Sequence, residues 1–126
     1  MSQRILIVED DRDFRGLLQD LVEALGCEPV PVDRATKAWR VLPEDSIALM
    51  LLDIKMPQVK GHELITFMRR RGRDVPIIVV SGYLNPEIVE VLLEHKIRQV
   101  ITKPFKFQRL AREISEVLEG GSPGPV

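Results

Sequence analysis

The fold is decided by one stretch, Leu49-Met50-Leu51-Leu52-Asp53-Ile54-Lys55-Met56-Pro57, in which an apolar run ends in a single carboxylate and a loop closed by proline. A continuous apolar run of this length, bounded by turn signals, indicates a strand that is buried on both faces. In an open parallel α/β sheet, ligands bind at the carboxyl ends of the strands. We therefore predict that Asp53 lies at the ligand-binding edge of a central strand.

Three other segments end in the same way, because each apolar run stops at a polar side chain. The runs at residues 5–8, 77–80 and 100–102 are followed by Glu9-Asp10-Asp11, by Ser81-Gly82 and by Lys103-Pro104, respectively. If the sheet is parallel, these carboxylates, the hydroxyl and the ammonium converge with Asp53 on one edge.

Length and composition restrict the class of protein. A chain of 126 residues with 44% apolar and 29% charged residues is typical of one soluble globular domain. The net charge of −1 gives no reason to expect nucleic-acid or anionic-membrane binding. The single cysteine, Cys27, fits a reducing compartment, and a strand that begins near Ile5 leaves no room for a signal peptide. We expect a cytoplasmic protein without a membrane span.

Strand and helix patterns alternate along the whole chain. Strands are predicted at residues 4–8, 28–32, 48–53, 75–80 and 99–102. Helices are predicted at about 13–25 and 35–42, around residues 64–68 after Gly61, from the start signal Asn85-Pro86-Glu87 through Leu92, and at 107–118. Strict alternation with right-handed crossovers predicts an α/β fold with a doubly wound five-stranded parallel sheet and helices on both faces. Pro29 and Pro31 place the second strand at an edge, which favours the order 2-1-3-4-5. We expect one domain over residues 1–119 and a flexible Gly/Pro-rich tail or linker over 120–126.

Clustered carboxylates raise one another's pKa and are tolerated where a cation lies among them. Oxygen ligands without imidazole or thiolate suit Mg²⁺, which keeps waters for a phosphate. Lys103 and Ser81 add an ammonium and a hydroxyl that can stabilise a transferring phosphoryl group. Asp53 is then the expected nucleophile, which would form an aspartyl phosphate.

Over about residues 3 to 119, the sequence resembles the receiver domain of two-component response regulators. The matching residues are Glu9-Asp10, Arg15, Asp53 followed by Met56-Pro57, Gly61, Ser81-Gly82 and Lys103-Pro104-Phe105. Each motif is weak alone, but together, in this order and at this spacing, they are specific.

The resemblance implies that Asp53 accepts a phosphoryl group from a histidine kinase or a phosphotransfer protein. Asp10, Asp53 and the backbone carbonyl of Lys55 would bind Mg²⁺ directly, and Glu9 would act through water. The domain would then be a switch that catalyses its own phosphorylation and dephosphorylation, and not a metabolic enzyme.

The resemblance also implies roles for the remaining motifs. Lys103 would bridge Asp53 and the phosphoryl group, Ser81 would move toward the phosphate on activation, and Gly82 would contact it. The bond before Pro104 is expected to be cis.

One position departs from the family pattern. Receivers usually carry Tyr or Phe three residues before the lysine of the fifth strand, and this chain has Val100 there. We hypothesise that Tyr83, two residues after Ser81, partly substitutes for that switch or shields the phosphoryl group. The output face, built by the fourth helix, fifth strand and fifth helix, would otherwise switch by loop and helix displacement.

Two alternatives come from other functional classes. A phosphatase of the haloacid dehalogenase type needs a second Asp two residues after its nucleophile, but this chain has Lys55 there and no cap insertion. An unphosphorylated pseudo-receiver would act as a protein-binding module. A Mg²⁺-dependent reaction with acetyl phosphate would discriminate between such a module and a phosphoacceptor.

The remaining charged and metal-binding candidates have simpler interpretations. Arg69-Arg70-Arg71 and Arg73 indicate the charged end of a surface helix, not a nucleic-acid site, since no aromatics are interleaved. Asp11 is interpreted as a solvated neighbour of the acidic pair, and the separation of His62 and His95 argues against a transition-metal site. The output domain or downstream protein stays unknown, and the resemblance leaves open a homodimer through the output face.

Overall fold

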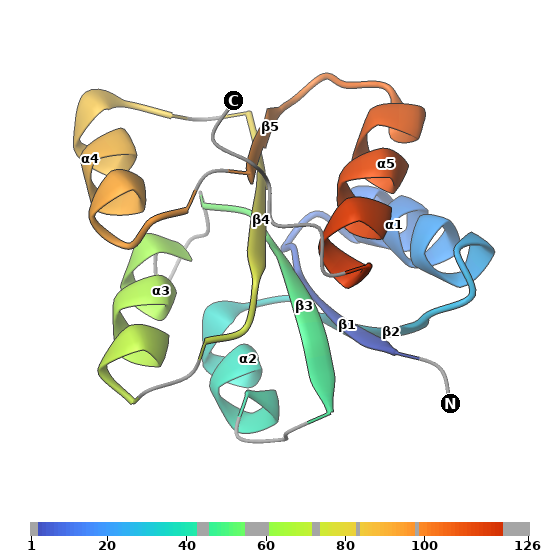
Figure 1. The fold of residues 1–126 in the computed structure, drawn as a ribbon, viewed down its shortest axis with the longest axis horizontal. Coiled ribbons are helices and arrows are strands. Elements are labelled where there is room, and N and C mark those ends of the chain that lie inside the picture. The colour runs from blue at the N-terminus through green and yellow to red at the C-terminus, as the bar shows by residue number, and fades with distance from the viewer. Residues whose placement is uncertain are drawn as a thin grey trace.

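The computed structural model describes residues 3–42, 46–54, 61–71, 74–82, 84–97 and 99–119. Its sheet contains five parallel strands in the order β2-β1-β3-β4-β5 (Figure 1). The strands are β1 (Arg4–Val8), β2 (Glu28–Val32), β3 (Ile47–Leu52), β4 (Ile77–Ser81) and β5 (Gln99–Thr102). The predicted fold class and strand order are therefore confirmed, with the proline-bearing β2 at one edge.

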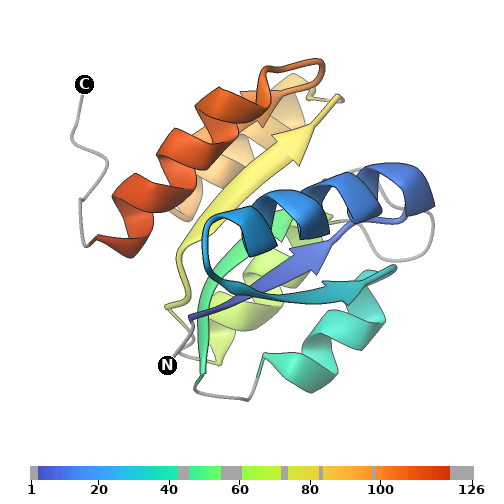
Figure 2. The same cartoon turned by 90° about the vertical axis from the view of Figure 1, so that its right-hand side faces the viewer.

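In the described part of the chain, five helices alternate with the strands and cover both faces of the sheet (Figures 1 and 2). They are α1 (Arg12–Ala24), α2 (Ala35–Val41), α3 (Gly61–Arg70), α4 (Pro86–Glu94) and α5 (Phe107–Leu118). Helices α1 and α5 lie on one face, and α2, α3 and α4 lie on the other. No described helix is long and apolar enough to cross a membrane.

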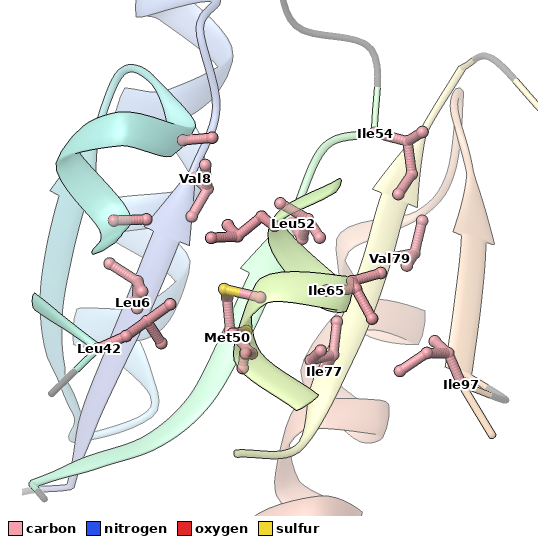
Figure 3. Packing of buried hydrophobic residues seen from close by; sticks show 14 of the residues in the cluster. Leu6, Val8, Leu42, Met50, Leu52, Ile54, Ile65, Ile77, Val79 and Ile97 are labelled. Atoms are coloured by element: carbon pink, nitrogen blue, oxygen red, sulfur yellow. The ribbon is translucent and has the colours of Figure 1, made fainter. Parts of the chain in front are cut away.

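Alternation along the strands divides the core into two clusters. In β1 and β3, the side chains of Leu6, Val8, Met50 and Leu52 lie on the side of the sheet that faces α2 and α3, as Figure 3 shows. The same cluster includes Ile88 and Leu92 of α4. Their neighbours Ile5, Ile7, Leu49 and Leu51 belong to the cluster under α1 and α5. Because successive side chains of a strand point to opposite faces, a continuous apolar run is what a sheet covered on both sides requires.

The element boundaries differ from the predicted ones by one or two residues. The strand β4 runs through Ser81, which pairs with Thr102 of β5, so Ser81 is the last residue of the strand and not the first residue of the loop. Helix α1 begins at Arg12 because Asp11 caps it: the Oδ1 atom of Asp11 accepts a hydrogen bond of 3.0 Å from the backbone N–H of Phe14. Asp11 is exposed, as expected of a solvated neighbour, and it also has this capping role.

Gly26 ends α1 in a left-handed conformation, with a φ of +80°. A Cβ at Gly26 would meet no heavy atom within 4 Å, so only the backbone conformation opposes a side chain there. Gly16 lies inside α1 and is equally open. Alanine substitutions at the two glycines therefore measure two effects separately. At Gly26 they measure the cost of a positive φ, and at Gly16 they measure the gain in helix propensity.

We expect Gly26→Ala to lower the free energy of unfolding by about 1–2 kcal/mol. Gly16→Ala should instead raise it by about 0.5–1 kcal/mol, because alanine favours a helix interior. Urea denaturation of both variants tests the pair. Equal effects of the two substitutions would contradict the assigned conformation at Gly26.

Candidate functional site

The carboxyl ends of the strands bring the predicted site residues together. Backbone hydrogen bonds continue one residue past the strands: Asp53 N donates to Val8 O at 3.0 Å, and Lys103 N donates to Ser81 O at 3.0 Å. Glu9 N likewise donates to Val32 O at 3.2 Å. Each polar side chain is thus held at the sheet edge by the backbone that precedes it.

Three carboxylates form the centre of the site. Glu9, Asp10 and Asp53 each offer an oxygen, and these oxygens lie within 4.8 Å of one another. Glu9 is 1% exposed and Asp53 is 7% exposed, whereas Asp10 is exposed to solvent. An all-oxygen donor set with one solvent-facing member suits a hard divalent cation that retains water ligands, so these residues fit Mg²⁺.

The ammonium of Lys103 neutralises part of this charge. Its Nζ atom lies 2.8 Å from Oε1 of Glu9 and 3.7 Å from Oδ2 of Asp53. It also lies 4.2 Å from the centre of the Phe14 ring. The Lys103 ammonium therefore contacts the carboxylates of Glu9 and Asp53 and one aromatic ring. The family resemblance assigns this lysine a bridging role.

Arg15 holds the backbone of the acidic pair in place. Its Nη1 atom donates to the carbonyl oxygen of Glu9 at 2.9 Å and to that of Asp10 at 3.3 Å. The backbone N–H of Asp11 donates to Oε2 of Glu9 at 3.2 Å. The match of Arg15 to the family pattern thus has a local physical reason, since this side chain orients the two acids that precede α1.

Burial raises the pKa of Glu9 from its ordinary value of 4.5 to about 7. The hydrogen bond from Lys103 opposes this effect, the charge of Asp53 adds to it, and the N–H of Asp11 also favours the ionised form. A carboxyl with a raised pKa holds its proton more tightly in the folded chain than in the unfolded one.

This shift predicts how stability depends on pH without metal. Between pH 4.5 and about 7 the folded chain binds more protons at Glu9 than the unfolded chain, so its contribution to the free energy of unfolding falls as pH rises. Glu9→Gln should remove this contribution and flatten the dependence. Urea unfolding of both proteins in EDTA across this window gives the difference, and parallel profiles would contradict the assignment.

Ser81 and Gly82 lie beside Lys103. Ser81 is fully buried at the end of β4. A Cβ placed on Gly82 would lie 3.6 Å from Cβ of Lys103, which is ordinary van der Waals contact. The backbone of Gly82 therefore lies close to the methylene groups of the Lys103 side chain. The bond between Lys103 and Pro104 is cis, as predicted.

Some predicted residues do not join the described site. Lys55, Met56, Pro57 and Tyr83 lie outside the described residues. Val100 is half-buried on β5 and packs against the cluster under α2, α3 and α4.

The contact between Phe14 and Lys103 is not predicted by the sequence pattern. Helical spacing places Phe14 only in the apolar stripe of the first helix, because residues 89 positions apart in the sequence give no local signal of contact.

Comparison with known proteins identifies the family. The model of the response regulator receiver domain matches residues 5–115. The response regulator protein FleR of Pseudomonas aeruginosa is 30% identical over 98% of this chain and 26% of its own length. The receiver protein CpdR of Brucella abortus is 32% identical over 92% of this chain and 97% of its own length.

A solved structure agrees with these relatives. The CheY-like receiver domain protein from Methanospirillum hungatei has a TM-score of 0.89 and 27% identity, over 96% of this chain and 97% of that chain. The chain also spans 34% of the length of the regulator of RpoS of Escherichia coli. It therefore spans nearly all of CpdR but only about a quarter to a third of FleR and of the regulator of RpoS. With the parallel sheet and the acidic edge described above, these matches show that the chain belongs to the response regulator receiver domain family of two-component systems.

Proposed function

We propose that Asp53 is the phosphoacceptor of this receiver domain and that a histidine kinase or phosphotransfer protein is the donor. The observation that carries the proposal is the position of the Asp53 carboxylate. It is nearly buried at the end of β3, beside two further acids, with the Lys103 ammonium 3.7 Å away. An ionised carboxylate in this setting can act as a nucleophile without a general base.

In the proposed reaction, a carboxylate oxygen of Asp53 attacks the phosphorus of phosphohistidine. The new P–O bond forms as the P–N bond breaks, and the electron pair of the broken bond stays on the imidazole nitrogen. Lys103 stabilises negative charge on the phosphoryl oxygens, and the Ser81 hydroxyl donates to one of them. Hydrolysis of the acyl phosphate by water later regenerates Asp53.

The acidic cluster fits Mg²⁺, which supplies positive charge beside the transferring phosphoryl group when it is bound. Asp10 and Asp53 would hold it directly, and Glu9 would hold it through water. The Lys55 carbonyl remains part of the proposed ligand set, although it lies outside the described residues. The domain would be a switch and not a metabolic enzyme, because its product is its own modified side chain.

The signal would leave through the face formed by α4, β5 and α5. Val89 and Leu93 of α4 are 40% and 68% exposed, which supports a contact surface for an output domain, a downstream protein or a second copy. Switching there would proceed without an aromatic at Val100, with Tyr83 as the proposed partial substitute. Direct nucleic-acid binding is not proposed: Arg69 pairs with Asp74 at 3.5 Å, and Arg71 lies over the Phe67 ring.

The decisive experiment measures intact mass after incubation with Mg²⁺ and a small donor, either acetyl phosphate or phosphoramidate. Wild type should gain one phosphoryl group, about 80 Da, and Asp53→Asn should gain none. Omitting Mg²⁺ should suppress the gain, and thermal unfolding of Asp53→Asn controls for its fold. Phosphorylation of the variant would overturn the assignment of Asp53. A wild-type chain that reacts with neither donor would favour the unphosphorylated pseudo-receiver.

A further inference from the structure

The first turn of α1 places an aromatic ring against the lysine of the site. The centre of the Phe14 ring lies 4.2 Å from Nζ of Lys103, within the range of a cation–π interaction. The lysine side chain is 26% exposed, so this ring covers part of an ammonium that would otherwise face more water. A partly desolvated ammonium is attracted to a ring face more strongly than one in water.

A second aromatic ring contacts Phe14 directly, and a third ring lies behind the second. Phe105, in the loop between β5 and α5, packs edge-on against Phe14 with a centroid distance of 5.9 Å and an interplanar angle of 85°. Phe107 is the first residue of α5, and the centre of its ring lies 5.8 Å from that of Phe105. The backbone N–H of Phe14 is in turn fixed by the Asp11 cap. The ring is therefore oriented both by the capped backbone and by its contact with Phe105.

A lysine needs such support more than an arginine does. Its ammonium is a point charge on four flexible methylene groups, and holding it in one place costs rotamer entropy. In this site the Nζ atom of Lys103 lies closer to Oε1 of Glu9, at 2.8 Å, than to Oδ2 of Asp53, at 3.7 Å. A ring on the α1 side limits the remaining directions in which the ammonium can move.

We propose that Phe14 is a positioning residue that holds the Lys103 ammonium over the acidic cluster for phosphoryl transfer to Asp53. The inference rests on the proposed function, because the step that it assists is the phosphorylation of Asp53. Phe14 does not touch the reacting atoms and acts through Lys103.

The first test compares Phe14→Leu with Phe14→Tyr. Leucine keeps an apolar side chain on α1 but removes the ring, so the limiting rate constant of phosphorylation by acetyl phosphate should fall about threefold to thirtyfold. The Mg²⁺ concentration for half-maximal rate should change little, since Phe14 contributes no oxygen ligand. Tyrosine keeps the ring face and should restore most of the rate.

Phe107→Leu is the matched control, because it removes an aromatic from the same cluster, one ring away from Lys103. It should lower thermal stability as much as Phe14→Leu does and leave the rate constant near that of wild type. Equal rate losses in the two leucine variants would overturn the inference, because they would indicate a general loss of packing.

A double-mutant cycle separates action through Lys103 from a structural effect. In a Lys103→Met background, Phe14→Leu should cause no further loss of the residual rate. The same fractional loss in both backgrounds would overturn the inference.

NMR tests the contact independently of the reaction. Ring currents should shift the ε-methylene protons of Lys103 upfield in wild type and in Phe107→Leu, but not in Phe14→Leu. An unshifted wild-type signal would overturn the inference.

The two proposals fail in different ways. A wild-type chain that is never phosphorylated would overturn the proposed function and with it the kinetic role of Phe14. A Phe14→Leu variant that is phosphorylated as fast as wild type would overturn this inference alone.

Discussion

Lys103→Met should lower the rate constant of phosphorylation by acetyl phosphate by about 100-fold or more, the loss typical of removing one preorganised charge-stabilising donor. Methionine has a similar length but no charge, so the variant keeps most of the packing of the stem beside Gly82. The ammonium it removes lies 2.8 Å from Glu9 and 3.7 Å from Asp53. Negative charge on the transferring phosphoryl group would then lose the stabilising charge of this ammonium.

The same substitution should also change the resting site. The hydrogen bond from Lys103 opposes the rise in the pKa of Glu9, so its loss should raise that pKa further. Without metal, the contribution of Glu9 to the free energy of unfolding should therefore keep falling up to a higher pH in Lys103→Met than in wild type. Urea unfolding of both proteins in EDTA across this pH range measures the difference.

Lys106→Met is the matched control for the rate. Lys106 is exposed three residues further along the same loop, at the N-cap position of α5. Lys106→Met changes the net charge by the same amount as Lys103→Met. Any general electrostatic effect on the approach of acetyl phosphate should therefore appear in both variants. A Lys103→Met protein that reacts within threefold of Lys106→Met would contradict the role assigned to Lys103.

Leu51→Ala should destabilise the fold by about 2–5 kcal/mol, the range for large-to-small substitutions in a rigid core. Leu51 is 1% exposed on β3, the middle strand of the sheet, and belongs to the cluster under α1 and α5. The loss is a large part of the total stability of a typical domain, about 5–15 kcal/mol. Urea denaturation gives the value directly.

Leu93→Ala provides the contrast for that measurement. Leu93 is 68% exposed on α4, so the same chemical change should alter the free energy of unfolding by no more than about 0.5 kcal/mol. A loss below 1 kcal/mol in Leu51→Ala would show that this part of the core relaxes around the missing side chain. Comparable losses in the two variants would contradict the burial assigned to them.

The sequence alone determined the fold and the members of the acidic site. Every side chain from Leu49 to Leu52 is apolar, and the run ends at the Asp53 carboxylate. A short apolar run bounded by turn signals is typical of a strand covered on both faces. Pro29 and Pro31 placed β2 at an edge because they cannot donate to a neighbouring strand. Once the strands are parallel, their ends meet at one edge, so Glu9 and Asp53 had to be neighbours.

Tertiary structure alone decided how these residues share their interactions. The pattern indicated that Lys103 would reach the carboxylates, but only the packing of α1 beside the end of β5 brings Phe14 over its ammonium. The raised pKa of Glu9 likewise depends on burial, which no local pattern encodes. Local periodicity specifies elements and faces, whereas the contacts between side chains distant in sequence depend on the path of the folded chain, and those contacts set the charge balance of the site.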